Sequence, residues 1–350
     1  MMGSGFSRRN FIKKATMTTG IAGLGSINFV SGTARNRKEV NRREVWVAGI
    51  SQERLVADSP QHMLASVLGQ MAKSLYYQPD IICLPEVFAT SNIKNTYSLQ
   101  EKLDFSKEVL NTLSKFASEN YCYVVAPVYT EEGRNIFNSA VLLDRHGKGM
   151  GEYRKTHITQ NEINNGLTPG PLDPPVFDTD FGRVGIQICF DILWDDGWTG
   201  LREKEAELVF WPSAYGGGQT VNGKAWQHKY MVASSTRKGA AKLCDVTGEE
   251  VTQTGFWTNN LFCGPLNFEK VFLHTWPLVQ QFGAIEKKYG RDIKITHYHE
   301  EEWAIIECVS PEVSIKEIMN EYGLKSFNQY VLESQLAQDK VRKKTLKKLG

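Results

Sequence analysis

Residues 184–190 read VGIQICF, and residues 208–211 read LVFW. Both runs are short and almost wholly apolar, which is typical of strands that are buried on both faces. The intervening residues 199–205 have a helical pattern, and an amphipathic helix is also predicted at residues 58–78, ahead of an apolar strand at 80–84. Buried strands that alternate with helices indicate an α/β layered fold.

The same alternation extends to both sides of this segment. The pattern predicts a helix that includes residues 109–117, strands at 121–129 and 138–143, a turn at 144–147 into 151–154, a helix at 224–235, a strand at 242–246, and one or two strands within 293–309. Residues 255–295 are rich in aromatic side chains and follow no assignable pattern. Residues 340–348 carry six basic residues, which is typical of a solvated tail or a frayed helix.

Composition and charge exclude several classes of protein. Of the 350 residues, 41% are hydrophobic and 23% are charged, which excludes a chain that is disordered throughout. A multi-pass membrane protein is excluded because no run approaches the ~20 apolar residues that a transmembrane helix needs. The 41 Lys and Arg residues against 39 Asp and Glu residues give a net charge of +2, which argues against a dedicated nucleic-acid binder.

The N-terminus has the pattern of an export signal. Residues 7–13 read SRRNFIK, a mildly apolar run without acidic residues follows at 15–30, and residues 32–34 offer the small-x-small pattern of a signal peptidase site. This order is similar to a twin-arginine signal, so we expect residues 1–34 to be removed and the folded protein to be periplasmic or secreted. An amphipathic helix and a basic tail are the alternatives. Removal would take away four basic and no acidic residues, leaving 37 against 39, and no stable membrane anchor is expected.

Three polar residues stand where predicted apolar strands stop: Glu86, Lys155 and Cys189. In an open α/β sheet, side chains at strand ends and in the following loops are the ones free to do chemistry. Each also has a structural interpretation, as an exposed turn acid, a surface base and a buried strand thiol. Together, a carboxylate, an ammonium and a thiol could supply the proton shuttle, the oxyanion stabiliser and the nucleophile of amide hydrolysis.

The sequence around these residues resembles the nitrilase superfamily of carbon–nitrogen hydrolases. The signatures are LPE at 84–86, YRKTH at 153–157 and GIQICFD at 185–191. Similar flanking motifs are NSA at 138–140, PG at 169–170 and WPSA at 211–214. The resemblance covers roughly residues 44–255 and continues weakly to about 310. It implies a four-layer αββα sandwich over residues 44–310, with residues 311–350 as a C-terminal extension that carries the basic tail.

The resemblance also implies a Glu86, Lys155 and Cys189 catalytic triad. Cys189 would attack the carbonyl carbon as a thiolate, which the neighbouring cation favours. Glu86 would move the protons, and Lys155 would stabilise the oxyanion together with the backbone N–H of Phe190. Neither a cofactor nor a metal is expected. The partners we expect are a small amide-type substrate and a second copy of the chain, in a homodimer or a larger homo-oligomer.

Further residues near the triad are candidates for orienting the substrate. Glu162 falls where the family often has a second active-site glutamate, although it could be a loop acid. Amidases and carbamoyl hydrolases of the family often place an arginine after the cysteine motif, whereas this chain has Leu193, Trp194 and Asp195 there. Trp194 and Asp195 could line the acyl pocket, or Trp194 could pack under the next helix. The motif HYHEE at 297–301 fits a solvent-edged strand better than a metal site.

The sequence thus predicts a hydrolase that cleaves a small amide or an N-carbamoyl compound through a cysteine thioester and releases ammonia or an amine. A nitrilase and a non-catalytic binding protein on the same scaffold are the alternatives. If Cys189 is a free nucleophile, at least one of the other five cysteines is also unpaired. The disulfide state of those five stays open, because an exported chain favours disulfides whereas several of the cysteines lie in apolar runs.

Overall fold

The computed structural model describes residues 44–255 and 259–349. The predicted export signal and the aromatic residues Phe256 and Trp257 lie outside the described residues. Two six-stranded sheets make up most of the structure. The first sheet has the order β12 (Leu261–Asn267), β1 (Glu44–Ile50), β2 (Ile81–Cys83), β3 (Tyr123–Glu132), β4 (Asn135–Leu143), β5 (Gly149–Arg154). The second has the order β11 (Glu250–Gln253), β10 (Lys242–Cys244), β9 (Met231–Thr236), β8 (Leu208–Ser213), β7 (Arg183–Ile186), β6 (Val176–Asp178).

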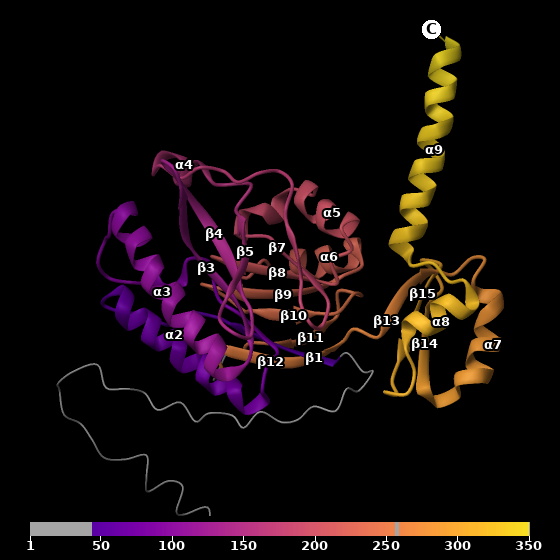
Figure 1. Cartoon of the computed structure of the whole chain (residues 1–350), viewed down its shortest axis with the longest axis horizontal. Helices are drawn as coiled ribbons and strands as arrows, with labels where there is room; N and C mark the ends of the chain where they lie inside the picture. Colours follow the sequence, from indigo (N-terminus) through magenta and orange to yellow (C-terminus); the bar gives the residue numbers. More distant parts are fainter. Residues whose placement is uncertain (1–43, 256–258, 350) are drawn as a thin grey trace, which may run out of the picture. The chain divides into compact units, whose positions relative to one another are not determined.

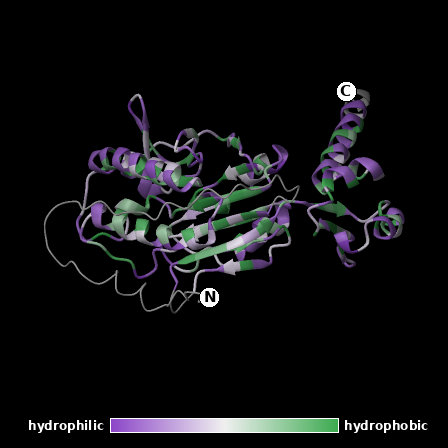
Figure 2. Ribbon diagram, turned by 60° about the horizontal axis from the view of Figure 1, so that its bottom comes forward, coloured by the Kyte–Doolittle hydropathy of each residue, from purple (hydrophilic) through white to green (hydrophobic). Residues whose placement is uncertain are grey.

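The two sheets pack face to face around one apolar core. Val47 and Val125 of the first sheet and Ile186 and Phe210 of the second belong to the same cluster of buried residues. Hydrophobic residues are concentrated in these strands (Figure 2). Because both faces of the central strands are covered, their sequences read as continuous apolar runs rather than as alternating ones.

Helices cover the outer faces of the sheets. The helices α2 (Pro60–Ser74) and α3 (Leu99–Asn120) lie against the first sheet, and α5 (Asp196–Glu203) and α6 (Gln219–His228) lie against the second (Figure 1). The helix α3 begins with a capping box, in which the Glu101 N–H donates to the Ser98 hydroxyl at 3.2 Å and the Ser98 N–H donates to the Glu101 carboxylate at 2.7 Å. The predicted α/β sandwich is therefore confirmed.

Residues beyond β12 form a smaller unit with a core of its own. A three-stranded sheet has the order β13 (Lys270–His274), β15 (Trp303–Cys308), β14 (Ile293–Tyr298), and packs with α7 (Val279–Tyr289) and α8 (Ile315–Tyr322). The predicted tail at 340–348 belongs to the helix α9 (Phe327–Leu349). The domain boundaries at 310 and 311 stay a prediction.

The helix predicted at residues 224–235 is wrong over its second half. The helix α6 ends at His228, Lys229 adopts a left-handed conformation with φ of 60°, and Met231 begins the buried strand β9. Residues 231–236 pair in parallel with β8 along the whole strand. Pairing with a distant strand therefore overrode a local helical pattern.

Most of the aromatic residues that the structure describes between 259 and 295 are buried within the chain. Phe262, Phe268, Phe272 and Phe282 are buried in the cores of the protein, whereas Trp276 is 54% exposed. The four buried rings therefore cover the protein's own sheets and give no support for an interface between copies. The homodimer or larger homo-oligomer stays a prediction that rests on the resemblance alone.

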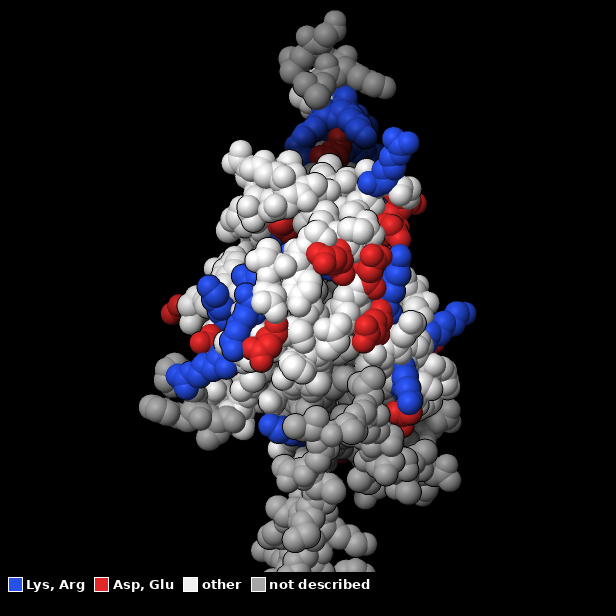
Figure 3. Space-filling model, turned by 90° about the vertical axis from the view of Figure 1, so that its left-hand side faces the viewer, with Lys and Arg blue, Asp and Glu red and all other residues white. Residues whose placement is uncertain are grey.

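The surface and the cysteines bear on the other sequence expectations. On the face shown in Figure 3, basic and acidic side chains are interspersed without a broad patch of one sign.

Within the part of the chain that the structure describes, none of the helices combines the length and the apolar composition that crossing a bilayer requires. All six cysteines lie in the described part, and all carry free thiols.

Lys229 is buried in a cage of aromatic rings. Its Nζ lies 3.5 Å from the ring centroid of Trp303 and 4.0 Å from that of Trp226, and it also donates to the Trp226 carbonyl. Burial lowers the pKa of Lys229 to about 7, although Glu301 opposes this shift. The ring faces also favour the ammonium form, so they act in the same direction as Glu301.

We expect this lysine to make the folded protein more stable as the pH rises from 7 to 9. The folded pKa lies below the unfolded value of ~10.4, so between the two the unfolded chain binds one more proton, and the free energy of unfolding rises with pH. Lys229→Met should reduce that rise by roughly 1–2 kcal/mol, measured by urea unfolding at pH 7, 8 and 9. The exposed Lys238 gives the control Lys238→Met, and equal pH dependence in the two variants would contradict the prediction.

Candidate active site

The three residues predicted to carry the chemistry all lie just beyond strand ends. Glu86 follows β2, Lys155 directly follows β5, and Cys189 begins the short helix η3 (Cys189–Leu193) after β7. The strand predicted at 184–190 thus ends at Ile186, so the thiol is not part of the ladder. Glu86, Lys155 and Cys189 are only 5%, 2% and 6% exposed. The structure therefore places all three inside the protein rather than on its surface.

Lys155 is the centre of the hydrogen-bond network. Its Nζ donates to Glu86 Oε1 at 2.8 Å and to the two carboxylate oxygens of Glu162 at 3.0 and 2.9 Å. Burial disfavours the ammonium, but Glu86, the thiolate form of Cys189 and Glu162 outweigh it and raise the pKa of Lys155 above its ordinary value. Lys155 is therefore a permanent cation between two carboxylates.

The loop that carries Lys155 is held by a glycine. The N–H of Gly170 donates to the Lys155 carbonyl at 2.8 Å. A Cβ atom at position 170 would lie 2.3 Å from the Arg154 carbonyl oxygen, which is far inside van der Waals contact. The Pro169–Gly170 motif thus allows the backbone to pass close enough to support the lysine.

Glu162 and Asn138 complete the network around the cation. Glu162 lies in the short helix α4 (Gln160–Asn164), and its Oε2 accepts from the Thr159 N–H at 2.8 Å in a capping box. Asn138 Nδ2 donates to Glu86 Oε1 at 2.8 Å and to Glu162 Oε1 at 2.9 Å. Burial opposes ionisation of Glu162, but Lys155, Asn138 and Thr159 hold its pKa below the ordinary value. In the sequence Asn138 stands out only as part of a flanking motif, and its contacts with the two glutamates were not predicted.

Cys189 rests as a neutral thiol. Burial, followed by the carboxylate of Glu86, raises the pKa of Cys189 to about 12. Lys155, the Ala214 N–H and the Ser213 hydroxyl favour the thiolate, but they do not compensate for these two effects. The expectation that the neighbouring cation favours the thiolate agrees with the effect of Lys155, but burial and Glu86 together favour the thiol more strongly. Ionisation instead requires a base that accepts the proton during attack.

The turn at Cys189 is strained and is fixed by buried hydrogen bonds. The φ of Cys189 is 46°, in the left-handed region that a residue with a Cβ rarely adopts. Asp191 Oδ2 accepts from the Ile188 N–H at 2.9 Å and from the Tyr153 hydroxyl at 2.7 Å. The Trp211 indole N–H donates to the Cys189 carbonyl at 3.0 Å. These contacts hold the thiol at the tip of the turn.

Asp191 also joins the nucleophile turn to the lysine loop. Its Oδ1 accepts from the His157 N–H at 2.7 Å and lies 3.2 Å from His157 Nδ1. Hydrogen bonding to Asp191 is the main cause that raises the pKa of His157 above its ordinary value. His157 and Asp191 thus fix the lysine loop against the nucleophile turn.

The remaining predicted residues lie on the outer side of the turn. The ring of Trp194 stacks on His157 with centroids 4.3 Å apart, contacts Phe190 edge-on at 5.1 Å, and is 40% exposed. Asp195 instead accepts from Lys224 Nζ at 2.5 Å and from Gln227 Nε2 at 2.6 Å, both on α6. Trp194 therefore lies at the rim of the site. Asp195 links the start of α5 to α6 through its hydrogen bonds.

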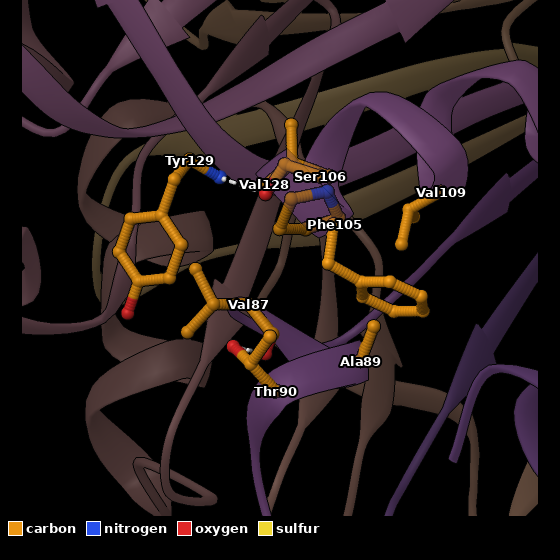
Figure 4. Close-up of a pocket in the computed structure, with 9 residues that line it drawn as sticks. Val87, Ala89, Thr90, Phe105, Ser106, Val109, Val128 and Tyr129 are labelled. Atoms are coloured by element: carbon orange, nitrogen blue, oxygen red, sulfur yellow. Dashed lines mark hydrogen bonds between the residues drawn. The ribbon is translucent and has the colours of Figure 1, made fainter. Parts of the chain in front are cut away.

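Tyr129 lies beside the triad. Burial, followed by the nearby carboxylates of Glu86 and Glu162, raises the pKa of its hydroxyl above the ordinary value, while Lys155 and Arg237 act in the opposite direction. Figure 4 shows a small apolar cavity next to it, and its backbone N–H donates to the Ser106 hydroxyl at 3.1 Å. This cavity of about 10 Å³ is too small for an organic substrate and has room for about one water molecule.

His297 and His299 belong to the motif at which no metal site was expected. Their rings stack with centroids 5.5 Å apart at the end of β14. Within residues 44–255 and 259–349, no group of three or more His, Cys, Asp and Glu side chains is placed to hold a metal ion.

A profile of the carbon–nitrogen hydrolase family matches residues 47–244, which is more than half of the chain. The chain belongs to the carbon–nitrogen hydrolase family. The matched region contains all of the residues described above as the candidate site. Among solved structures, an amidase from Nesterenkonia sp. is similar to this hydrolase with a TM-score of 0.57 and 19% identity, over 64% of this chain and 90% of that chain.

The curated relatives of this carbon–nitrogen hydrolase differ in their named activities. The deaminated glutathione amidase of Rattus norvegicus is 33% identical over 162 residues, which span 41% of this chain and 48% of that protein. The nitrilase of Pyrococcus abyssi is 30% identical over 137 residues, 38% of this chain and 51% of that protein. The citrullinase of Francisella tularensis is 27% identical over 168 residues, 45% of this chain and 58% of that protein. The chain thus spans about half the length of the curated relatives it matches.

Proposed function

We propose that this protein hydrolyses a small non-peptide amide or N-carbamoyl compound through a thioester on Cys189. The observation that carries this proposal is the buried Lys155 ammonium, which is hydrogen-bonded to Glu86 at 2.8 Å and electrostatically coupled to Cys189. A fixed base, a fixed cation and a strained thiol converge there. The amidases and the nitrilase among the relatives support a carbon–nitrogen bond as the target.

The acylation step follows from the protonation states. Because Cys189 rests as a thiol, Glu86 accepts its proton as the sulfur attacks the carbonyl carbon. The carbonyl π electrons move to oxygen, and the oxyanion is stabilised by Lys155 and the Phe190 backbone N–H. Protonated Glu86 then donates its proton to the leaving nitrogen, and the C–N bond breaks to give a thioester and free ammonia or amine.

Deacylation uses the same groups in reverse. Glu86 accepts a proton from a water molecule, which attacks the thioester carbonyl, and the Cys189 sulfur leaves and recovers its proton from Glu86. Lys155 remains an ammonium throughout, because Glu86, Cys189 and Glu162 raise its pKa. Glu162 and Asn138 hold Lys155 and Glu86 in place without taking part in proton transfer.

The experiment that tests this function is an ammonia-release screen over aliphatic amides, carbamoyl amino acids and nitriles. Acid and ammonia from amides or carbamoyl compounds, with nitriles untouched, is the expected result. Turnover of nitriles alone would favour the nitrilase activity instead. Binding without turnover of any compound would favour a non-catalytic protein on the same scaffold.

We also propose that the protein is exported in its folded state to the periplasm or the cell exterior. The support is the SRRNFIK pattern at residues 7–13, which lies outside the described residues. Replacing Arg8 and Arg9 by lysine should trap the precursor inside the cell, because the twin-arginine pathway reads both arginines. Fractionation and immunoblotting measure the effect, and a Lys14→Gln variant, just outside the pattern, is the control. Export that is unchanged after the double replacement would contradict the proposal.

A further inference from the structure

A second cation, Arg237, acts on the same tyrosine as the triad, and its Nε has no hydrogen-bond acceptor among the residues that the structure describes. Arg237 directly follows β9, and its N–H donates to the carbonyl of Ser213, the last residue of β8, at 2.8 Å. Ser213 and the next residue, Ala214, are the two whose donors favour the Cys189 thiolate. Arg237 is therefore anchored one strand away from the nucleophile.

The guanidinium shares an electrostatic environment with the triad. The hydroxyl of Tyr129 senses Glu86, Glu162, Lys155 and also Arg237. The two carboxylates already bind Lys155 and Asn138, at distances of 2.8–3.0 Å. Both carboxylates thus already have cationic or amide partners other than Arg237.

The Nε of Arg237 is buried, and among the described residues no hydrogen-bond acceptor contacts it. A buried donor on a cation without an acceptor is costly, and a bound water, an ion or a ligand that accepts from it removes this cost. The Nε–H and a neighbouring Nη–H form a planar fork that matches the two oxygens of a carboxylate. Because no described residue accepts from the Nε–H of this fork, a carboxylate is the ligand that fits it best.

We propose that Arg237 binds a carboxylate of the substrate, so the preferred substrates are amides or carbamoyl compounds that carry a second, anionic end. This inference rests on the proposed function, and it narrows the substrate class of the same site. Arg237 would supply the positive charge for this carboxylate from just beyond β9, which β8 alone separates from β7, the strand that precedes the nucleophile.

Matched substrate pairs test the inference. Succinamate and butyramide have the same length and differ in a terminal carboxylate against a methyl group, as do N-carbamoyl-β-alanine and propylurea. We expect kcat/KM to be higher for the anionic member of a pair. In Arg237→Met the ratio of kcat/KM between the two members should fall roughly 100-fold, which is the usual loss for hydrogen bonds to a charged group. Arg237→Lys should give an intermediate ratio, because it keeps the charge but loses the fork.

Lys238→Met is the matched control, because Lys238 is adjacent and exposed and the same charge is removed. It should leave the ratio unchanged. Wild-type protein that prefers butyramide, or an Arg237→Met variant with the wild-type ratio, would overturn the inference.

A binding measurement separates this inference from the proposed function. In Cys189→Ala, which cannot form the thioester, calorimetry should detect succinamate but not butyramide, and adding Arg237→Met should abolish the signal. If no amide is hydrolysed by the wild type but this Arg237-dependent binding remains, the proposed function fails and the carboxylate site stands. If amides are hydrolysed but succinamate binds equally well without Arg237, the carboxylate site fails and the function stands.

Discussion

Replacing Cys189 by alanine is expected to lower amide hydrolysis by about 10⁴-fold or more, since removing the nucleophile removes the covalent route. The fold should be retained, because alanine is smaller and the hydrogen bonds that fix the turn come from Asp191 and Trp211. The measurement is ammonia release with the best substrate of the screen, together with urea unfolding monitored by circular dichroism. Intact mass spectrometry of the wild type should also trap the acyl adduct, which the variant should lack.

Cys263 provides the control for this experiment. Its thiol is also partly shielded, and burial raises its pKa to about 12 as it does for Cys189, but it lies on β12 away from the site. Cys263→Ala should keep both the activity and the acyl adduct. An adduct that moves to another cysteine, or a Cys189→Ala variant with wild-type turnover, would contradict the assignment. Iodoacetamide labelling at neutral pH is a poorer test, because the resting thiol is protonated.

Replacing Lys155 by methionine is expected to damage both activity and stability. Loss of the oxyanion donor should lower kcat by roughly 10²–10³-fold. The free energy of unfolding should fall by about 3–5 kcal/mol, because Glu86 and Glu162 would become buried carboxylates without a counter-ion. Ammonia release and urea unfolding at pH 7.5 measure the two effects.

The loss of stability in Lys155→Met should also depend on pH. In the wild type the folded pKa of Glu162 is lowered, so its stabilisation is present above its unfolded pKa and is lost as pH falls through the folded value. Without Lys155 the carboxylate of Glu162 binds a proton more readily in the folded state. The stability deficit of Lys155→Met should therefore be larger at pH 7.5 than at pH 5.5, and a deficit that grows on acidification would contradict it.

A second substitution separates charge from packing. Lys155→Met with Glu162→Gln removes one of the two uncompensated carboxylates, so it should recover part of the lost stability. It should not recover activity, since the cation is still missing. Recovery of both, or of neither, would show that the ion network is not the cause.

Much of the fold could be predicted from local pattern. Apolar runs at residues 80–84, 184–190 and 208–211 predicted buried strands, because a strand with both faces covered needs no polar alternation. The failure at residues 224–235 has the opposite cause. There the local pattern was compatible with a helix, but parallel pairing of residues 231–236 with β8 stabilised a strand instead. Residues 255–295 could not be assigned, because Phe262, Phe268 and Phe272 pack in a core formed mainly by other parts of the chain.

The sequence by itself determined the α/β alternation and the positions of Glu86, Lys155 and Cys189 at strand ends, since both depend on short-range pattern and residue type. Only the tertiary structure decided that Asn138 bridges two glutamates, that Cys189 rests as a thiol, and that the Nε of Arg237 has no acceptor within the described part of the chain. These properties depend on burial and on contacts between residues far apart in the chain. Glu86 and Lys155, for example, are 69 positions apart. A protonation state follows from the solvent and charges around a group, and no local pattern encodes that environment.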